Sequence, residues 1–141
     1  PAPAHTGIAG SSMGGLISLY GFLKYPDVFG MCGAFSPVFW YNDNALYQTI
    51  QTYATGHGRV YLDIGTQEGE VYAYLVSNKS TPDEAAHSVY RDGVRQLRDG
   101  LMQKGYSANL LYVEDEGARH NEYAWAKRLP DSFRFLFKER V

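Results

Sequence analysis

Several features common in proteins are scarce in this 141-residue sequence. Its single cysteine, Cys32, excludes a disulfide or a cysteine-based metal site within one chain, and the apolar stretch around it predicts a buried structural thiol. No run of about 18 apolar residues indicates a transmembrane helix. A net charge of -2 with interspersed signs provides no basic stripe for nucleic acid and no polybasic segment for a membrane surface. We therefore expect a small-molecule partner, no nucleic acid and no membrane.

The composition itself is ordinary: 45% of the residues are hydrophobic and 20% are charged. These fractions are typical of one globular domain, which we place over residues 1–141. No histidine and carboxylate pair has the spacing of metal ligands, so we expect neither a metal nor another cofactor. One thiol and a loop-like beginning leave the cellular compartment open, and we favour the cytoplasm.

Strand-like and helix-like segments alternate from end to end, which predicts an α/β fold with a mostly parallel sheet and helices on both faces. The expected strands cover residues 6–9, 30–35, 59–64 and 109–113. Expected helices cover residues 16–24, a segment starting at Asn42 or Asp43, residues 81–105, and a last segment after His120. The polar residues 65–80 predict a long loop between the third strand and the third helix.

The ends of the later helices have clear signals. Thr81, Pro82 and Glu84 have the pattern of a capped helix start, and Gly105 marks the end of the same helix. In the last helix, Pro130 predicts a kink or break. The residues of that helix expected to pack inward are Trp125, Leu129, Phe133 and Leu136.

The most informative motif is Gly10-Ser11-Ser12-Met13-Gly14, which lies between an expected strand and an expected helix. In this G-x-S-x-G context the central serine occupies a sharp turn that only small neighbours allow, and its Oγ is presented at the end of the strand. The following helix directs its free N–H groups and positive dipole toward the same point. The motif predicts Ser12 as a nucleophile, with the Met13 N–H as one oxyanion donor.

A serine nucleophile needs a base and an orienting carboxylate, which follow it in the order Ser, Asp or Glu, His in this type of fold. His120 lies in a glycine-containing loop between the last strand and the last helix, and we expect it to be the base. Glu68, just past the third strand, is the preferred acid, with Glu70, Asp63 and Asp115 as alternatives. The other histidines have positions typical of surface residues: His5, His57 and His87.

These residues predict acyl transfer in two steps, in which Ser12 attacks an ester carbonyl, His120 moves the proton and Glu68 holds the imidazole. The loop after the second strand is expected to wall the substrate pocket. The pocket residues we expect are Ser11, Phe39, Trp40 and Tyr41. Membership of a plain core cluster is an equal alternative for Phe35 and Phe39.

Four motifs together carry a family resemblance over nearly the whole chain. They are Ile8-Ala9-Gly10-Ser11-Ser12-Met13-Gly14-Gly15, Phe35-Ser36-Pro37, Asp63-Ile64-Gly65-Thr66 and Gly117-Ala118-Arg119-His120 through Trp125. In this order they resemble the Putative esterase family of α/β-hydrolases, to which enterochelin and feruloyl esterases belong. The resemblance implies a three-layer fold, a carboxylic ester substrate, and triad positions at Ser12, Glu68 and His120. Many relatives carry Asp where this chain has Glu68.

The resemblance covers only the carboxyl-terminal part of that fold, because family members have several strands and an oxyanion loop ahead of the serine motif. The strand before Ser12 would then be an exposed sheet edge. We expect the amino-terminal half of the same fold, or a homo-oligomer, to complete the sheet. Two alternatives to an ester hydrolase stay open: an acyltransferase with the same triad, and an inactive interaction module.

Overall fold

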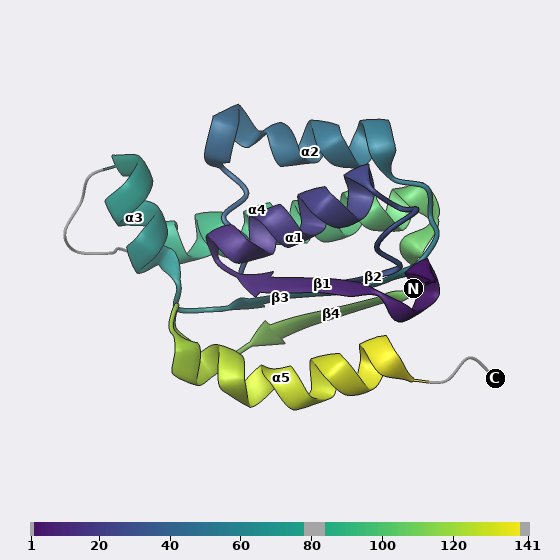
Figure 1. Cartoon of the computed structure of the whole chain (residues 1–141). Helices are drawn as coiled ribbons and strands as arrows, with labels where there is room; N and C mark the ends of the chain where they lie inside the picture. The colour runs from purple at the N-terminus through teal and green to yellow at the C-terminus, as the bar shows by residue number, and fades with distance from the viewer. Residues whose placement is uncertain (1, 78–83, 139–141) are drawn as a thin grey trace.

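A four-stranded parallel sheet forms the centre of the computed structural model, which describes residues 2–77 and 84–138 (Figure 1). The strands lie in chain order and are β1 (Gly7–Ser11), β2 (Met31–Phe35), β3 (Arg59–Gly65) and β4 (Leu110–Asp115). Each neighbouring pair is parallel, so all four carboxyl ends lie at one edge of the sheet. The prediction of four parallel strands is confirmed.

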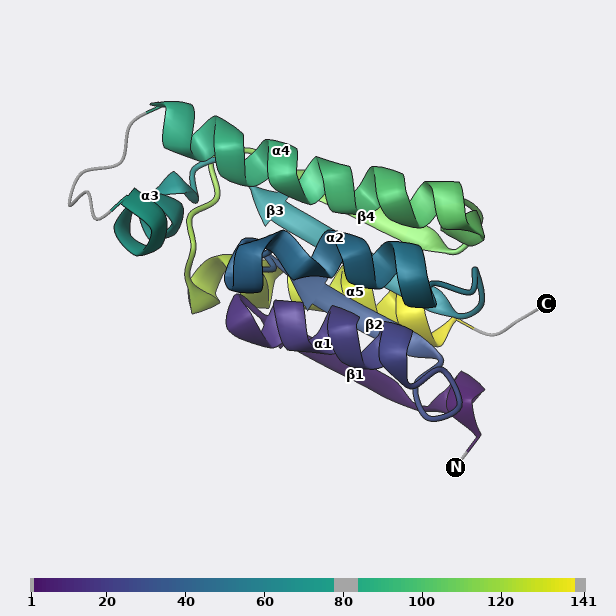
Figure 2. The same cartoon turned by 90° about the horizontal axis from the view of Figure 1, so that it is seen from above.

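Helices cover both faces of the sheet, so the expected α/β fold with three layers is also confirmed (Figures 1 and 2). On one face lie α1 (Met13–Lys24), α2 (Tyr41–Tyr53) and α4 (Glu84–Leu101), with α2 between the other two. On the opposite face lies α5 (Glu122–Phe137). Short helical turns occur at Pro3–His5 and, directly after α4, at Met102–Tyr106. Gly105 in the second turn has a φ of 98°, which is outside the helical region, so the helical path of the chain ends near this residue.

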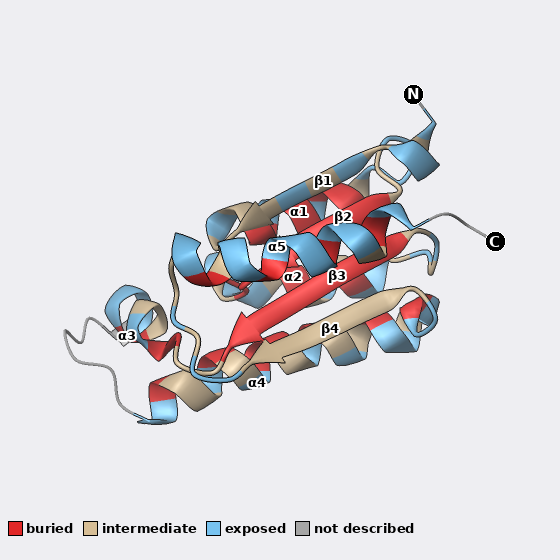
Figure 3. Cartoon of the chain, turned by 90° about the horizontal axis from the view of Figure 1, so that it is seen from below, coloured by how far each residue is buried: buried red, intermediate tan, exposed pale blue. Residues whose placement is uncertain are grey.

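Successive strand residues point to opposite faces, and this alternation divides the core in two. Under α1, α2 and α4, the cluster includes Cys32, Val60 and Leu62 from the strands. Under α5, a smaller cluster consists of Met31, Phe35, Tyr61 and Leu136. Cys32 is fully buried, as expected. Figure 3 shows that the central strands β2 and β3 are buried, whereas β1 and β4 at the sheet edges are more exposed.

Two predictions about the loops were wrong. The segment expected to be a long loop contains a helix, α3 (Gly69–Ser77), which lies beyond the carboxyl ends of the strands. Neither Asn42 nor Asp43 caps α2: that helix starts at Tyr41, and Asn42, Asp43 and Asn44 have φ angles of 49°, 56° and 60°. Asn and Asp tolerate this left-handed region better than other non-glycine residues. The capped start expected at residues 81–83 lies outside the described residues.

The inward face of α5 differs from the expected one. Leu129 and Phe133 are 40% and 41% exposed, whereas Arg128 and Ser132 are buried together with Leu136. The buried face of α5 therefore includes Arg128 and Ser132, each one residue before the apolar residue that hydrophobic spacing had assigned to the core. The helix also continues through Pro130 without a break. Within the described residues no helix has the length and apolar character needed to cross a bilayer.

Candidate active site

Ser12 lies in the turn between β1 and α1, with φ and ψ of 59° and -119°. Positive φ is costly for a residue with a Cβ, and three backbone hydrogen bonds hold this conformation. The Ser12 N–H donates to the Phe35 carbonyl at 2.9 Å, and the Ser12 carbonyl accepts from Leu16 and Val38 at 3.1 and 3.3 Å. A Cβ on Gly10 would lie 2.6 Å from the Gly14 carbonyl oxygen, so the turn requires glycine at position 10. The motif therefore forms the sharp turn that the sequence predicts.

Three side chains from separate loops form a continuous hydrogen-bonded line at the carboxyl edge of the sheet. His120, between β4 and α5, places Nε2 at 2.8 Å from the Ser12 Oγ. Its Nδ1 lies 2.7 Å from Oε1 of Glu68, which sits between β3 and α3. Glu68 is fully buried and the His120 side chain is 14% exposed. The structure thus brings together the three residues expected to act in acyl transfer.

The other carboxylates considered for the acid have different partners. Asp63 accepts hydrogen bonds from Arg128 Nε at 2.7 Å and from the Tyr61 hydroxyl at 2.7 Å. Asp115 pairs with the Arg128 Nη1 at 3.1 Å. Glu70 is exposed and accepts from Arg119 at 3.0 Å. Among these side chains, the one bonded to His120 is Glu68.

The second oxygen of Glu68 is also fully engaged. Its Oε2 accepts from the Gly65 N–H and from the Ser36 hydroxyl, the latter at 2.7 Å. Both groups donate to the charged carboxylate, which stabilises it in a buried position. An imidazole is a stronger base than a carboxylate, so the proton between Oε1 and Nδ1 belongs to His120, and Nε2 is free to accept from the Ser12 hydroxyl. This is the tautomer that a general base requires.

Arg128 supplies a fixed positive charge behind the site. Its guanidinium is buried, and Nη2 lies 4.0 Å from the Glu68 Oε2. Burial disfavours the charged form, but the attraction and hydrogen bonds of Asp63 and Asp115 raise the pKa of Arg128 above its ordinary value. Arg128 therefore stays protonated. The sequence gives no motif that marks this residue, because a single arginine in a helix of mixed composition is typical of an exposed position.

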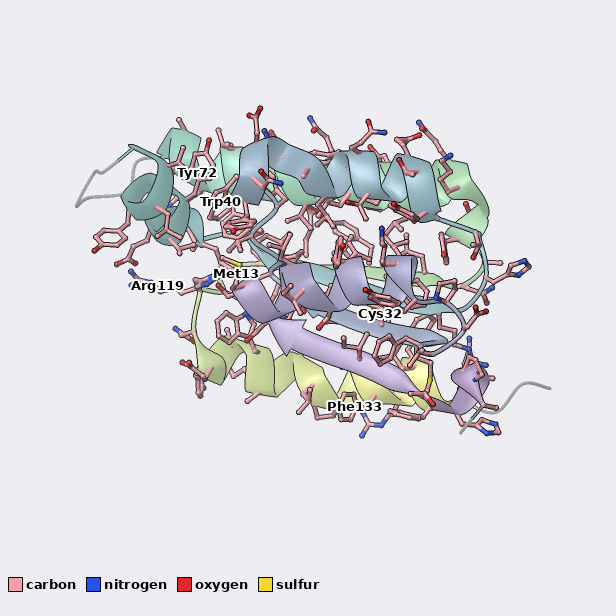
Figure 4. All side chains as sticks on the ribbon, turned by 45° about the horizontal axis from the view of Figure 1, so that its top comes forward. Met13, Cys32, Trp40, Tyr72, Arg119 and Phe133 are labelled. Atoms are coloured by element: carbon pink, nitrogen blue, oxygen red, sulfur yellow. The ribbon has the colours of Figure 1, made fainter. Side chains whose placement is uncertain are left out.

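Aromatic rings surround the imidazole and the neighbouring loop. His120 meets the Trp125 ring edge-on at 4.9 Å between centroids, and the Tyr90 ring lies at 5.9 Å. Trp40 is packed edge-on between Tyr90 at 4.9 Å and Tyr72 at 5.0 Å. Burial raises the pKa of Tyr90 well above its ordinary value, so its hydroxyl remains a donor, to the Ser36 carbonyl. Figure 4 shows Trp40, Tyr72, Met13 and Arg119 gathered at this end of the molecule.

A hollow of about 580 Å³ opens next to the serine turn, between α1 and α2. Met13 and Tyr41 are among its lining residues, and both side chains are exposed. Phe39, in contrast, is only 6% exposed and belongs to the core under α1, α2 and α4. Ser11 is half-buried at the end of β1. Of the expected pocket residues, Tyr41 therefore borders this hollow, while Phe39 packs in the interior.

The described residues contain no group of three or more His, Cys, Asp or Glu side chains that could hold a metal ion.

A family model whose description is Putative esterase matches residues 1–136. The chain belongs to the Putative esterase family. Over 136 aligned residues the chain is 29% identical to the uncharacterized protein YbbA of Bacillus subtilis (strain 168), and the alignment covers 96% of this chain and 50% of that protein.

Solved structures of esterases share the fold of this Putative esterase family member. Enterochelin esterase from Shigella flexneri aligns with a TM-score of 0.75 and 18% identity over 97% of this chain and 32% of that one. The siderophore hydrolase EstA from Aspergillus nidulans aligns with a TM-score of 0.70 and 23% identity over 91% and 47%. The chain thus spans about a third to a half of the length of these relatives.

Proposed function

We propose that this chain hydrolyses carboxylic esters through a covalent acyl-enzyme intermediate, with Ser12 as nucleophile, His120 as general base and Glu68 as the orienting acid. The observation that carries the proposal is the unbroken line of hydrogen bonds from the Ser12 Oγ through both imidazole nitrogens to Glu68. Membership of an esterase family supports the same class of reaction.

In the first step, the Ser12 Oγ attacks the ester carbonyl carbon while its proton moves to the His120 Nε2. The oxyanion that forms lies at the start of α1, where the Met13 N–H has no partner four residues earlier in the helix. Collapse expels the alcohol, which takes the proton from His120. In the second step, water deprotonated by His120 attacks the acyl-enzyme, which releases the acid and restores Ser12.

The surroundings of Ser12 favour a neutral substrate with an apolar or aromatic part. Met13 and Tyr41 border the hollow between α1 and α2, whose surface is mainly apolar. Trp40 and Ser11 lie on the loop and strand end next to the serine turn. We propose that these four residues contact the substrate. Esterases with related folds act on enterochelin and on siderophores, which makes small aromatic or siderophore-type esters suitable first candidates.

The free edge of β1 implies a further partner. β1 pairs with β2 on one side, and among the described residues no strand pairs with its other side. An unpaired edge next to the nucleophile is a ready site for strand addition. We propose that an amino-terminal half of the same fold, or a second copy of the chain, completes the sheet here and supplies a second oxyanion donor.

The decisive experiment is intact-mass analysis after exposure to a fluorophosphonate, with Ser12→Ala as the control. The Ser12 Oγ would displace fluoride from phosphorus, so we expect a stoichiometric mass increase that Ser12→Ala abolishes. Equal labelling of the variant would place the reactive group elsewhere. Absence of labelling in a folded protein, with and without the proposed sheet partner, would refute the esterase proposal.

A further inference from the structure

Ser36 directly follows β2 and has a hydrogen-bond partner at each of its polar atoms. It is fully buried, with a φ of 45°. Its backbone N–H donates to the Asp63 Oδ1 at 2.9 Å, and its carbonyl accepts from the Tyr90 hydroxyl. A residue held at both backbone groups in a rarely populated conformation has a fixed position. Its side chain is therefore placed with little freedom.

The Ser36 hydroxyl has three partners, two of which can only donate. The Trp125 Nε1–H lies 3.0 Å from the Ser36 Oγ, and the Arg128 Nη2 lies 3.1 Å from it. An indole N–H and a guanidinium have no acceptor, so they fill both lone pairs of the hydroxyl. The Ser36 proton must then point to its third partner, the Glu68 Oε2, at 2.7 Å. The polarity of this hydrogen bond is thus determined by the two donors on α5.

The direction of the hydrogen bond from Ser36 to Glu68 also affects the imidazole of His120. Because Ser36 donates to Oε2, that oxygen of Glu68 must be an unprotonated acceptor. The Gly65 N–H donates to the same oxygen and cannot reverse its role. A proton shared by Oε1 and the His120 Nδ1, 2.7 Å apart, lies on the nitrogen because an imidazole is a stronger base than a carboxylate, so Oε1 accepts from the Nδ1–H. The hydroxyl of Ser36 thereby acts on the tautomer of His120, two hydrogen bonds away.

We infer that Ser36 is a positioning residue of the site: it transmits the donor character of Trp125 and Arg128 to the Glu68 Oε2 and, together with the Gly65 N–H, stabilises the carboxylate that holds His120 in the base tautomer. The catalytic part of this inference rests on the proposed ester hydrolysis, whereas the hydrogen-bond part does not. Serine suits the position because alanine lacks the hydroxyl and leaves two buried donors unpaired. Threonine is β-branched, which makes a φ of 45° costly.

The test compares Ser36→Ala with Ser132→Ala. Ser132 is also a fully buried serine, and its Oγ donates to the Leu129 carbonyl at 2.7 Å within α5. Two quantities are measured: the second-order rate of fluorophosphonate labelling and the downfield proton NMR resonance of the His120 Nδ1–H. A hydrogen bond to a charged acceptor supports a change of about 10- to 100-fold, so we expect labelling of Ser36→Ala to slow by that factor. Its His120 resonance should also move upfield, while Ser132→Ala should match the wild type in both.

A second variant, Trp125→Phe, keeps an aromatic ring beside His120 and removes one of the two donors to Ser36. We expect a shift of the His120 resonance in the same direction and a smaller loss of labelling rate, below about 10-fold. This variant decides the question if Ser36→Ala does not fold. Unchanged rates and resonances in the folded variants would overturn the inference. A wild type that is not labelled, but whose His120 resonance responds to Ser36→Ala, would instead reject the esterase proposal and keep the positioning role.

Discussion

Replacing Glu68 by Gln tests the proposed triad most sharply, because all partners of the carboxylate are donors. A carboxamide keeps the shape but presents one NH₂ group. The Gly65 N–H cannot become an acceptor, so the amide oxygen has to take the Oε2 position. The NH₂ then faces the His120 Nδ1, which must accept from it. The proton of the neutral imidazole moves to Nε2, opposite the Ser12 hydroxyl, and the base is lost.

The expected loss is large. A neutral substitution that enforces the wrong imidazole tautomer in a serine triad lowers kcat by about 10⁴-fold, with the geometry intact. This factor corresponds to about 5 kcal/mol of lost transition-state stabilisation. We would measure the rate of fluorophosphonate labelling and the kcat for a p-nitrophenyl ester with Glu68→Gln protein shown to be folded by circular dichroism. A loss of less than about 10-fold, around 1.4 kcal/mol, would refute the tautomer argument.

Glu70→Gln is the matched control, since Glu70 is two residues away and carries the same charge. Its carboxylate is exposed and pairs with Arg119 on the surface. Exposed ion pairs contribute about 1 kcal/mol at most, and this one does not touch His120, so we expect rates within about twofold of the wild type. If Glu70→Gln were the slow variant and Glu68→Gln the active one, the acid would be misassigned.

The remaining predictions concern stability and exposure. Gly10→Ala would place a Cβ 2.6 Å from the Gly14 carbonyl oxygen, so urea unfolding should show a loss of about 1–3 kcal/mol. Gly14→Ala meets no described atom within 4 Å and should leave the free energy of unfolding unchanged or higher. Burial raises the pKa of the Cys32 thiol, so Ellman's reagent should react only as the protein unfolds, and fast reaction of native protein would contradict the burial. The Arg95 guanidinium holds the pKa of Glu114 below its ordinary value of 4.5, so this pair stabilises the fold above that pH and the contribution is lost as the pH falls further. Glu114→Gln should therefore flatten the acid side of the stability curve by less than about 1 kcal/mol, and a steeper curve would contradict the sign.

The sequence allowed the strands and the serine turn to be predicted because both depend on local rules. The strands are short runs rich in apolar residues, and β3 and β4 end where glycine-containing or polar segments begin, at Gly65 and Glu116. Parallel strands place their carboxyl ends at one edge, which brings Ser12, Glu68 and His120 to the same region without knowledge of any contact. Glu68 was the preferred acid from the sequence, but the distances among these side chains, and the partners of Glu68 and Glu70, needed the structure.

The helix α3 could not be recognised because its side chains lack a clear amphipathic pattern. It begins at a glycine, and its apolar residues Tyr74, Leu75 and Val76 are exposed. Helical periodicity is a signal only when one face is buried, and this helix packs mainly on α4 at the end of the sheet. A short polar segment followed by exposed apolar residues is then indistinguishable from a loop.

The hydrogen bonds that join Ser36, Asp63 and Arg128 next to Glu68 were not predicted, for a different reason. Hydrophobic spacing in α5 selected Leu129 and Phe133, but the buried positions one residue earlier hold Arg128 and Ser132. Charged and polar residues are rarely buried without partners, so the sequence alone favoured the apolar reading. The partner that makes burial possible, Asp63, lies 65 residues away on β3. The sequence does contain one signal. Asp63 lies in the middle of an expected strand, where a carboxylate needs a cationic partner, and Arg128 lies among the inward-facing positions of the last helix.

The orientation of α5 about its axis affects the site, because two side chains of this helix donate hydrogen bonds to Ser36. Trp125 and Arg128 lie three residues apart, so they share one face of the helix and reach the same hydroxyl of Ser36. Apolar packing alone would allow a helix to rotate slightly about its axis. The ion pair of Arg128 with Asp63 restricts that rotation at a named atom of β3, at 2.7 Å. Because Asp63 also binds the Ser36 N–H, one buried carboxylate positions both the donors on α5 and the hydroxyl that receives them. If Ser36 positions Glu68 as we propose, Asp63 contributes to the same arrangement through its contacts with Arg128 and Ser36.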